Sequence, residues 1–444
     1  MRLTHVNVTK CIPVPMSVKR FLRSVRWLLA LIVGCGLLAV QGEAAKDTPV
    51  KPPVPGGDYV VIGWNDLGMH CINPSFKDLA ILPPYNNLWV QVIKRGDPPV
   101  IVTSGITLEY SIVNNTTVIN KTDFWQHAKQ LFGVDLPEGI GLTNNGLSGT
   151  MKPMGNHFEA TGIPVLPYDD NMNWNPYQIA TVKMRVAGSG IPRKIQVVLP
   201  VSDELNCASC HAQGMDATVN LPNDGTDSVD VNILMVHDYY HGSKGVTTTG
   251  PDLMLERPVL CASCHADPAL GKPGDGTSKP LSQAIHGWHA TRLNDPTAGC
   301  YSCHPGQNTQ CLRTGIKGMG YLGETPSCQT GLCHGGMQQI ADSIGKEGRE
   351  PWLQEPTCEQ CHGSNVATGQ DLYRHARGHG GLMCAACHNS PHAWWPSKMW
   401  ADNTQTVKLQ HAPTALGDCS VCHTRKLEGR NPHVTYYPVT GTPP

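Results

Sequence analysis

The chain has 444 residues and a formal net charge of −1 at pH 7, with 16% of its residues charged. A charge so close to zero provides no basic patch for nucleic acid and indicates no strongly charged partner. Aromatic residues make up only 6% of the chain, whereas Gly and Pro together account for 82 residues. This composition predicts a loop-rich protein.

The amino terminus has the pattern of an export signal. A basic stretch comes first, an apolar stretch follows at 27–40, and small residues at 42–45 provide a cleavage region. We therefore expect residues 1–45 to be a signal peptide, cleaved near Ala44 or Ala45, and the protein to lie in the periplasm or at the outer surface. No later segment approaches the ~20 apolar residues of a membrane span, so the mature chain should have none.

A lipid anchor is the alternative to cleavage at this point. The stretch from Ile32 to Cys35 resembles a lipoprotein box, which would place a lipid on Cys35. The apolar run continues through Leu37, Leu38 and Val40, where lipoproteins usually turn polar. The cleaved, lipid-free form is therefore favoured.

Residues 46–57 read as a Pro/Gly/Lys linker, and 58–200 as a first domain that carries none of the cysteine motifs described below. Apolar and polar residues alternate at 59–62, 88–93, 106–113, 180–186 and 194–199, with Gly, Pro and Asn between these segments. This alternation predicts an antiparallel β-sandwich-like domain. Periodicity is weak between 120 and 173, where we expect one short helix at 124–132 and long loops.

Two cysteines stand shortly before a histidine seven times between residues 207 and 423. The motifs are CASCH at 207, CASCH at 261, CYSCH at 300, CQTGLCH at 328, CEQCH at 358, CAACH at 384 and CSVCH at 419. Random placement of 18 Cys and 20 His would give about 0.03 CxxCH matches, so the six regular motifs are not accidental. In one helical turn, residues i, i+3 and i+4 share a face, which brings both sulfurs and the imidazole to one flat group.

This pattern predicts seven covalently attached haem c groups, each held by two thioether bonds and one histidine on the iron. Zinc would need four ligands, and iron–sulfur clusters would not need the histidine. The predicted attachment residues are Cys207, Cys210, Cys261, Cys264, Cys300, Cys303, Cys328, Cys333, Cys358, Cys361, Cys384, Cys387, Cys419 and Cys422. The predicted proximal ligands are His211, His265, His304, His334, His362, His388 and His423.

Residues 201–444 should form a heptahaem cytochrome c domain made of short helices and loops. About 34 residues per haem are too few for an ordinary side-chain core, so the porphyrins must provide much of the buried apolar surface. Without haem this half should not fold. Cys71 and Cys311 are the cysteines left over in the mature chain, and a disulfide between them and two buried thiols remain alternatives.

Nine further histidines lie in the haem region, so each of the seven irons can have a second axial ligand. We predict His237, His241, His286, His289, His379, His392 and His411 as these distal ligands. His375 and His433 are expected to be bystanders, with His70 and His157 in reserve. Methionine ligation at one or two sites, from Met215, Met235, Met254 or Met383, is the alternative. Sequence does not assign a distal histidine to each haem.

The second half of the chain resembles the multihaem c-type cytochromes of metal-respiring and other anaerobically respiring bacteria. The resemblance rests on CYSCHPG at 300–306 with TQCLR at 309–313, GHGG at 378–381 before CAACH, SPHA at 390–393, and LQH at 409–411. The NDLGMHC stretch at 65–71 is similar to the non-haem domain preceding the haems in some of these proteins. The resemblance implies electron transfer in the periplasm or at the cell exterior.

The favoured function is an electron carrier, and not a catalyst, that works in anaerobic respiration. It would exchange electrons with partner proteins, such as other cytochromes or an outer-membrane conduit, or with an external acceptor. One alternative is an oxidoreductase acting on a small nitrogen or sulfur oxyanion, with the variant CQTGLCH site as its reactive haem. A homo-oligomer or extracellular filament, in which a histidine such as His70 or His433 is donated across the interface, is a further alternative.

Overall fold

The computed structural model describes residues 57–188, 192–215, 217, 228–243, 245–246, 250–293, 300–305, 308–309, 311–315, 328, 334–355 and 372–424. These residues belong to one structural unit. The predicted signal peptide and the predicted linker up to residue 56 lie outside the described residues. Among the residues described, no helix is both long and apolar enough to cross a membrane.

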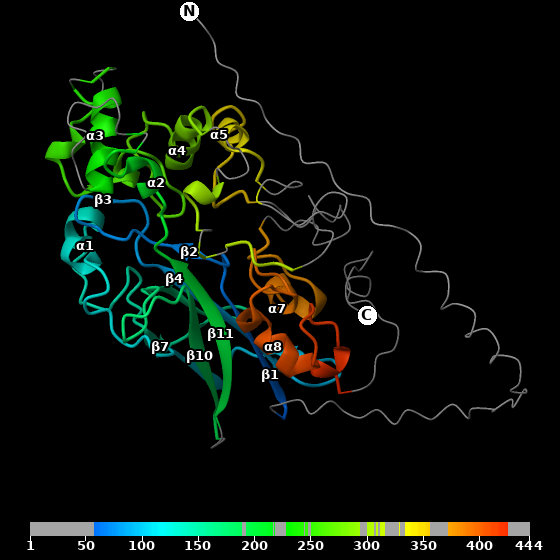
Figure 1. Ribbon diagram of the computed structural model, residues 1–444. Helices are drawn as coiled ribbons and strands as arrows, with labels where there is room; N and C mark the ends of the chain where they lie inside the picture. The colour runs from blue at the N-terminus through cyan, green and yellow to red at the C-terminus, as the bar shows by residue number, and fades with distance from the viewer. Residues whose placement is uncertain are drawn as a thin grey trace, which may run out of the picture. The chain divides into compact units, whose positions relative to one another are not determined.

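Two five-stranded sheets make up the first half of the described chain (Figure 1). The first sheet has the order β1 (Tyr59–Trp64), β4 (Asn86–Lys94), β9 (Phe158–Ile163) and β8 (Lys152–Pro153), with β5 (Val100–Ile101) paired to β4. The second has the order β2 (His70–Cys71), β11 (Arg193–Ser202), β10 (Tyr177–Val186), β6 (Ile106–Ile112) and β7 (Ser148–Thr150). Pairing is antiparallel throughout these sheets except between β2 and β11.

The two sheets share one apolar core. Alternate residues of β6 and β10, such as Tyr110 and Val182, are buried together with Val90 and Val92 of β4. Because side chains point to opposite faces of a strand in turn, one face of each sheet lines this core. The structure is therefore mixed α and β with largely antiparallel sheets. Four of the five predicted strand segments lie within observed strands, and the segment 106–113 extends one residue beyond β6.

The region between 120 and 173 contains more regular structure than predicted. Helix α1 (Phe124–Phe132) has the predicted bounds and ends at Gly133, whose φ of 75° is readily adopted by glycine. Long loops do lie in this region, at 133–147 and 164–176, but the prediction missed the strands β7, β8 and β9 between them. Strand β9 has the short sequence FEATGI and is completed by pairing with β4. A tertiary contact therefore decides its conformation.

The second half of the described chain consists of short helices and connecting loops. The α-helices are α2 (Ala208–His211), α3 (Val229–His241), α4 (Leu281–Ala290), α5 (Met337–Gly345), α7 (Cys384–His388) and α8 (Trp400–Gln410). The 3₁₀ turns are η1 (Leu253–Leu255), η2 (Cys261–Ser263), η3 (Cys300–Ser302), η5 (His379–Gly381) and η6 (Cys419–Val421). A two-stranded parallel ladder joins β12 (Val259–Leu260) to β3 (Leu79–Ala80) across the predicted domain boundary.

The outer face of the first sheet is covered by residues near the carboxyl end of the chain. Trp64 and Trp89 pack with Met383, Ala386 and other residues of 382–422 in a second buried cluster, and α7 and α8 lie beside β1 in Figure 1. Both faces of β1 and β4 are thus buried, which explains their nearly continuous burial. The sheets and residues 382–422 share a core across the predicted boundary at residue 200.

Two buried amide side chains at this contact are hydrogen bonded, whereas the indole nitrogens of Trp64 and Trp89 have no hydrogen-bond partner among the described residues. Gln405 of α8 accepts from the backbone N–H of Gly63 at 3.0 Å and donates to its carbonyl at 2.6 Å. Gln91 of β4 accepts from the N–H of Met383 at 2.9 Å. Burying such groups without partners would cost about 1–3 kcal/mol each, so the pairing fixes how the two segments meet.

Candidate haem-ligand sites

The described CxxCH motifs lie in short helical turns. In the motifs that begin at Cys207, Cys261, Cys300 and Cys419, the histidine N–H donates to the carbonyl of the first cysteine at 2.9, 3.0, 2.8 and 2.9 Å, respectively. The CAACH motif is helix α7 itself. This i to i+4 hydrogen bond brings the cysteines and the histidine to one side of the turn, as the spacing predicts.

Three motif histidines face a histidine from elsewhere in the chain. The ring centres are 6.1 Å apart for His304 and His286, and the rings are 19° from parallel. They are 6.0 Å apart for His334 and His392, and 6.0 Å apart for His423 and His379. In each pair, one histidine closes a Cys-containing motif and the other is a predicted distal ligand.

The separation in these pairs matches the space needed by a metal ion. A bond from a metal to an imidazole nitrogen is about 2 Å long, and the ring centre lies about 1.2 Å behind that nitrogen. Two imidazoles on opposite faces of an iron therefore have centres about 6.4 Å apart. The observed distances lie within a few tenths of an ångström of this value.

Two more motif histidines have a non-motif histidine nearby. Burial lowers the pKa of His211, and so does the neighbouring His289 of α4. Burial lowers the pKa of His237 on α3, and His241 and His265 are among the groups that contribute to this shift. These contacts associate His289 with the first motif and His237 with the second.

The Nδ1 atoms of these histidines are held by the surrounding protein. His211 donates to the side-chain oxygen of Asn232 at 2.7 Å, and His265 to the carbonyl of Lys279 at 2.6 Å. His286 donates to the carbonyl of Ser282 at 2.7 Å, and His289 to that of Ile285 at 2.8 Å. A hydrogen bond at Nδ1 fixes the ring and leaves Nε2 as the atom for a metal.

Segments of the first half supply two further acceptors. His392 donates through Nδ1 to the carbonyl of Leu67 at 3.2 Å, and His423 Nδ1 lies 3.4 Å from the carboxylate of Asp97. The backbone around His392 is also held, because its carbonyl accepts from the N–H groups of Arg313 and Thr314 at 2.6 and 2.8 Å. Loops that connect the strands therefore take part in building these two sites.

His304 lies among other histidines. The residue is accessible to solvent, yet burial, followed by His286 and His334, lowers its pKa to about 4. The low pKa keeps the imidazole neutral, which is the form that binds a metal.

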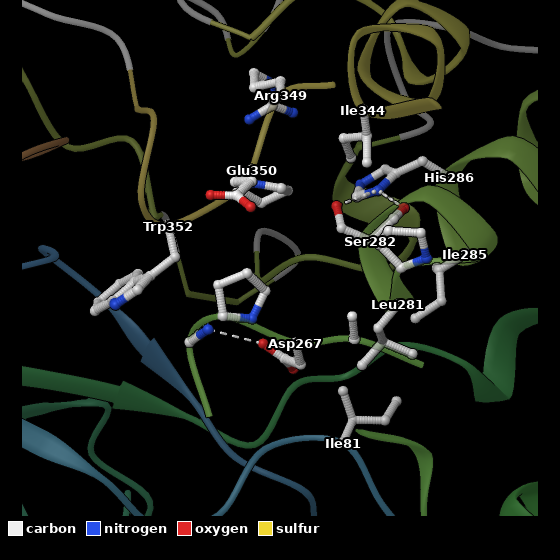
Figure 2. Close-up of a pocket in the computed structure, with 15 residues that line it drawn as sticks. Ile81, Asp267, Leu281, Ser282, Ile285, His286, Ile344, Arg349, Glu350 and Trp352 are labelled. Atoms are coloured by element: carbon white, nitrogen blue, oxygen red, sulfur yellow. Dashed lines mark hydrogen bonds between the residues drawn. The ribbon is translucent and has the colours of Figure 1, made fainter. Parts of the chain in front are cut away.

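A cavity of about 260 Å³ lies beside His286 (Figure 2). Leu281 and Ile285 of α4 line one side, Ile344 of α5 contributes to the lining, and Arg349 stands at its edge. Its lining is largely apolar, but it also includes Arg349 and the carboxylates of Asp267 and Glu350. The paired imidazoles and the motif cysteines fit haem as the bound group.

The motifs approach one another in space. The thiol pKa of Cys207 in the first motif is raised to about 11 by burial and then by Cys303 of the third motif. In the fourth motif, hydrogen bonding to Cys300 is the main cause that lowers the pKa of Cys328 to about 6. Near the carboxyl end, burial and then Cys387 raise the pKa of Cys422 to about 12. First and third, third and fourth, and sixth and seventh motifs are therefore neighbours.

The other predicted ligands are less clearly placed. His241 contacts His237, Tyr240 and Trp288, and His411 is exposed at the end of α8. His388 lies at the end of α7. Cys333, Cys358, Cys361, His362 and His433 lie outside the described residues. These assignments stay predictions.

The reserve histidines His70 and His157 are buried in the first half. His70 Nε2 is 2.9 Å from the carboxylate of Asp66, which occupies the nitrogen. Burial is the first cause that lowers the pKa of His157 to about 4, and its Nε2 is enclosed by protein with no hydrogen-bond partner. His375, a predicted bystander, lies with its ring centre 5.5 Å from that of Trp89.

Cys71 and Cys311 are close neighbours. Burial raises the pKa of both thiols, and each is present as a free cysteine in this structure. Cys311 is also a cause of the raised pKa of Cys71. Their proximity is consistent with either state considered from the sequence.

The groups that accept hydrogen bonds from the Nδ1 atoms of these histidines were not predicted from the sequence. Those on His265, His286, His289 and His392 are backbone carbonyls, which carry no residue-specific signal. Asn232 is fully buried in a helix interior, an unfavourable place for asparagine, and this oddity was a usable signal. Asp97 lies 326 residues from His423, and no sequence signal marked it as the partner of this histidine.

Comparisons with known proteins assign no family. No protein-family model and no curated protein matches the chain. The crystal structure of MtrC from Shewanella baltica OS185 aligns with 79% of this chain at 15% identity, with a TM-score of 0.15. The alignment spans 45% of that chain, and a likeness this weak carries no argument about fold or function.

Proposed function

We propose that the protein transfers electrons through about seven covalently bound haem c groups, most of them with two histidine ligands, in periplasmic or extracellular anaerobic respiration. The observation that carries the proposal is the pairing of motif and non-motif histidines at 6.0–6.1 Å. An iron closed on both faces by imidazole has no free position for a substrate, but it can still gain and lose an electron. This favours a carrier over a catalyst.

Within this proposal, each part of the chain has a definite task. The motif cysteines attach the haems, and the histidines of each motif bind the irons from one side. His286, His392 and His379 close the other side at the third, fourth and seventh motifs, and His289 and His237 do so at the first and second. When bound, each haem supplies an iron that accepts or donates one electron. Residues 201–444 would hold the haems, while 58–200 would support them.

The contacts between motifs support transfer from haem to haem. Cysteines of the first and third, third and fourth, and sixth and seventh motifs are near neighbours. Haems attached there would lie close to one another, and electron transfer is fast only between cofactors at short range. Donors and acceptors would be other cytochromes, an outer-membrane conduit or an external acceptor.

The oxidoreductase alternative is weakened at the site where the sequence favoured it. His334 of the variant CQTGLCH motif faces His392, so an iron there would also be closed. An enzyme would need a five-coordinate haem at another motif. Turnover of nitrite or hydroxylamine with a reduced viologen dye would support that alternative.

The intact mass and the electron paramagnetic resonance (EPR) spectrum of the ferric protein test the proposal. We expect the mass of seven haems and only low-spin signals. His392→Ala should convert one haem to a high-spin form, because it removes the imidazole facing His334. His157→Ala is the matched control and should leave every haem low-spin, since its enclosed Nε2 faces no motif histidine. A wild-type mass without haem would refute the proposal.

A further inference from the structure

Among the Nδ1 acceptors of the described ligand histidines, Asp97 differs in charge. His211 donates to an amide oxygen, and His265, His286, His289 and His392 donate to backbone carbonyls. His423 instead faces the carboxylate of Asp97, at 3.4 Å. The side chains of His423 and Asp97 are 13% and 19% exposed, although the residue Asp97 as a whole is accessible to solvent, which partly screens the contact.

Two other ligand histidines have a carboxylate nearby: Glu355 opposes the burial that lowers the pKa of His334, and Asp238 lies beside His237. His237 Nδ1 is 3.8 Å from Asp238, which is beyond hydrogen-bond reach. The two carboxylate oxygens of Asp238 accept from the N–H groups of Leu253 and Met254, at 2.8 and 2.9 Å. That carboxylate is therefore engaged in holding η1.

Backbone hydrogen bonds fix Asp97 beside His423. The N–H of Gly96 donates to the carbonyl of Cys422 at 3.2 Å, and the N–H of Thr424 donates to the carbonyl of Gly96 at 3.2 Å. Gly96 and His423 thus form a parallel bridge. Arg95 adds a hydrogen bond from Nη2 to the carbonyl of Ser420, at 2.9 Å. The carboxylate is therefore placed one residue from a rigid joint between the first half and the seventh motif.

We propose that Asp97 is a positioning residue that makes the haem at Cys419–His423 a low-potential site of the chain. This inference rests on the proposed function. A carboxylate that accepts the Nδ1 proton increases the electron density at Nε2, and the more basic ligand stabilises ferric over ferrous iron. A neutral carbonyl in the same position does so less. His379 would close the other face.

Arg95 is the opposing charge at this site. Its positive charge is near enough to Cys422 to oppose the rise in that thiol's pKa, and it would favour the ferrous state. It acts through space, however, whereas Asp97 acts on the ligand itself. The geometry therefore gives Asp97 the larger effect on the iron.

The test is a spectroelectrochemical titration of the full-length protein with its haems, combined with EPR of the ferric state. Asp97→Asn should raise one midpoint potential by a shift equivalent to about tenfold in the reduction equilibrium, which is about 59 mV for one electron. One low-spin EPR signal should change at the same time. Asp97→Glu retains the charge and should keep most of the low potential.

Asp418→Asn is the matched control. Asp418 precedes the same motif and accepts from the N–H of Ser420 at 2.9 Å, but the contacts of His423 do not include it. Its loss should shift the potential less than half as far. Equal shifts in the two variants, or seven unmoved potentials in an Asp97→Asn protein of full haem mass, would overturn the inference alone. A wild-type protein without haem would overturn the proposed function as well.

Discussion

Replacing Gly68 with alanine tests whether the loop at 65–68 is built around the His392 site. Gly68 has a φ of +89°, and an added Cβ would lie 1.8 Å from the carbonyl oxygen of Pro391. Backbone atoms make this contact, so no side-chain rotation can relieve it. The loop must move away from Pro391 and His392.

The expected cost follows from the contacts of this loop. The left-handed backbone costs an alanine about 1–2 kcal/mol. Movement would also weaken the bond from Arg313 Nη1 to the Gly68 carbonyl, at 2.8 Å, worth about 1.5–3 kcal/mol, and the Leu67–His392 bond, worth about 0.5–1.5 kcal/mol. We expect Gly68→Ala to lower the free energy of unfolding by about 3–6 kcal/mol.

Guanidinium unfolding of the haem-loaded protein, followed by tryptophan fluorescence, measures this change. Gly105→Ala is the control, because Gly105 has a φ of +70° and nothing within 4 Å of an added Cβ. It should cost only the backbone strain, about 1–2 kcal/mol. EPR should also show one altered haem signal in Gly68→Ala alone. Equal destabilisation of the two variants would refute the reasoning.

Three other changes have definite expected outcomes. Arg313→Met leaves the Asp402 carboxylate buried without its charged partner, since both side chains are 2% exposed, and should lower the free energy of unfolding by denaturant by about 3–5 kcal/mol. The double variant with Asp402→Leu should recover part of this loss. No recovery would argue against the ion pair. His286→Gln removes the imidazole facing His304, so EPR should lose one low-spin signal, and an unchanged spectrum would contradict the pairing. Burial, followed by Arg377 and His375, lowers the pKa of His157 to about 4. Because the unfolded chain binds this proton already near pH 6.5, the free energy of unfolding should decrease as the pH is lowered from about 6.5 to 4. His157→Gln should reduce this pH dependence when the free energy of unfolding is measured at a series of pH values.

Local patterns predicted those parts of the fold that local physics decides. Alternation identified the strands around Tyr110 and Val182, and α1 has the bounds expected for the one short helix at 124–132. Strand β9 was missed because its short sequence becomes a strand only through pairing with β4. The burial of both faces of β4 was missed for a related reason, since its outer cover comes from residues 382–422.

For the candidate sites, too, the local features were predicted from the sequence and the long-range contacts were not. Spacing alone identified the motif cysteines and histidines and indicated a surplus of possible distal ligands. Which histidine faces which motif depends on contacts between distant segments, as for His379 and His423. Leu67 and Asp97 act from another half of the chain, through a carbonyl and a carboxylate that no sequence pattern marks.

The hydrogen bonds between the first sheet and the carboxyl-terminal segment also bear on how the chain folds. Gly63 and Gln405 are 342 residues apart, and Arg95 and Ser420 are 325 apart. Synthesis proceeds from the amino terminus, so β1 and β4 exist long before the residues that cover their apolar outer face. Contacts of such long range form slowly, and an uncovered apolar sheet invites aggregation in the interval. Truncation before residue 382 should therefore yield a protein that associates with itself, however complete its first half.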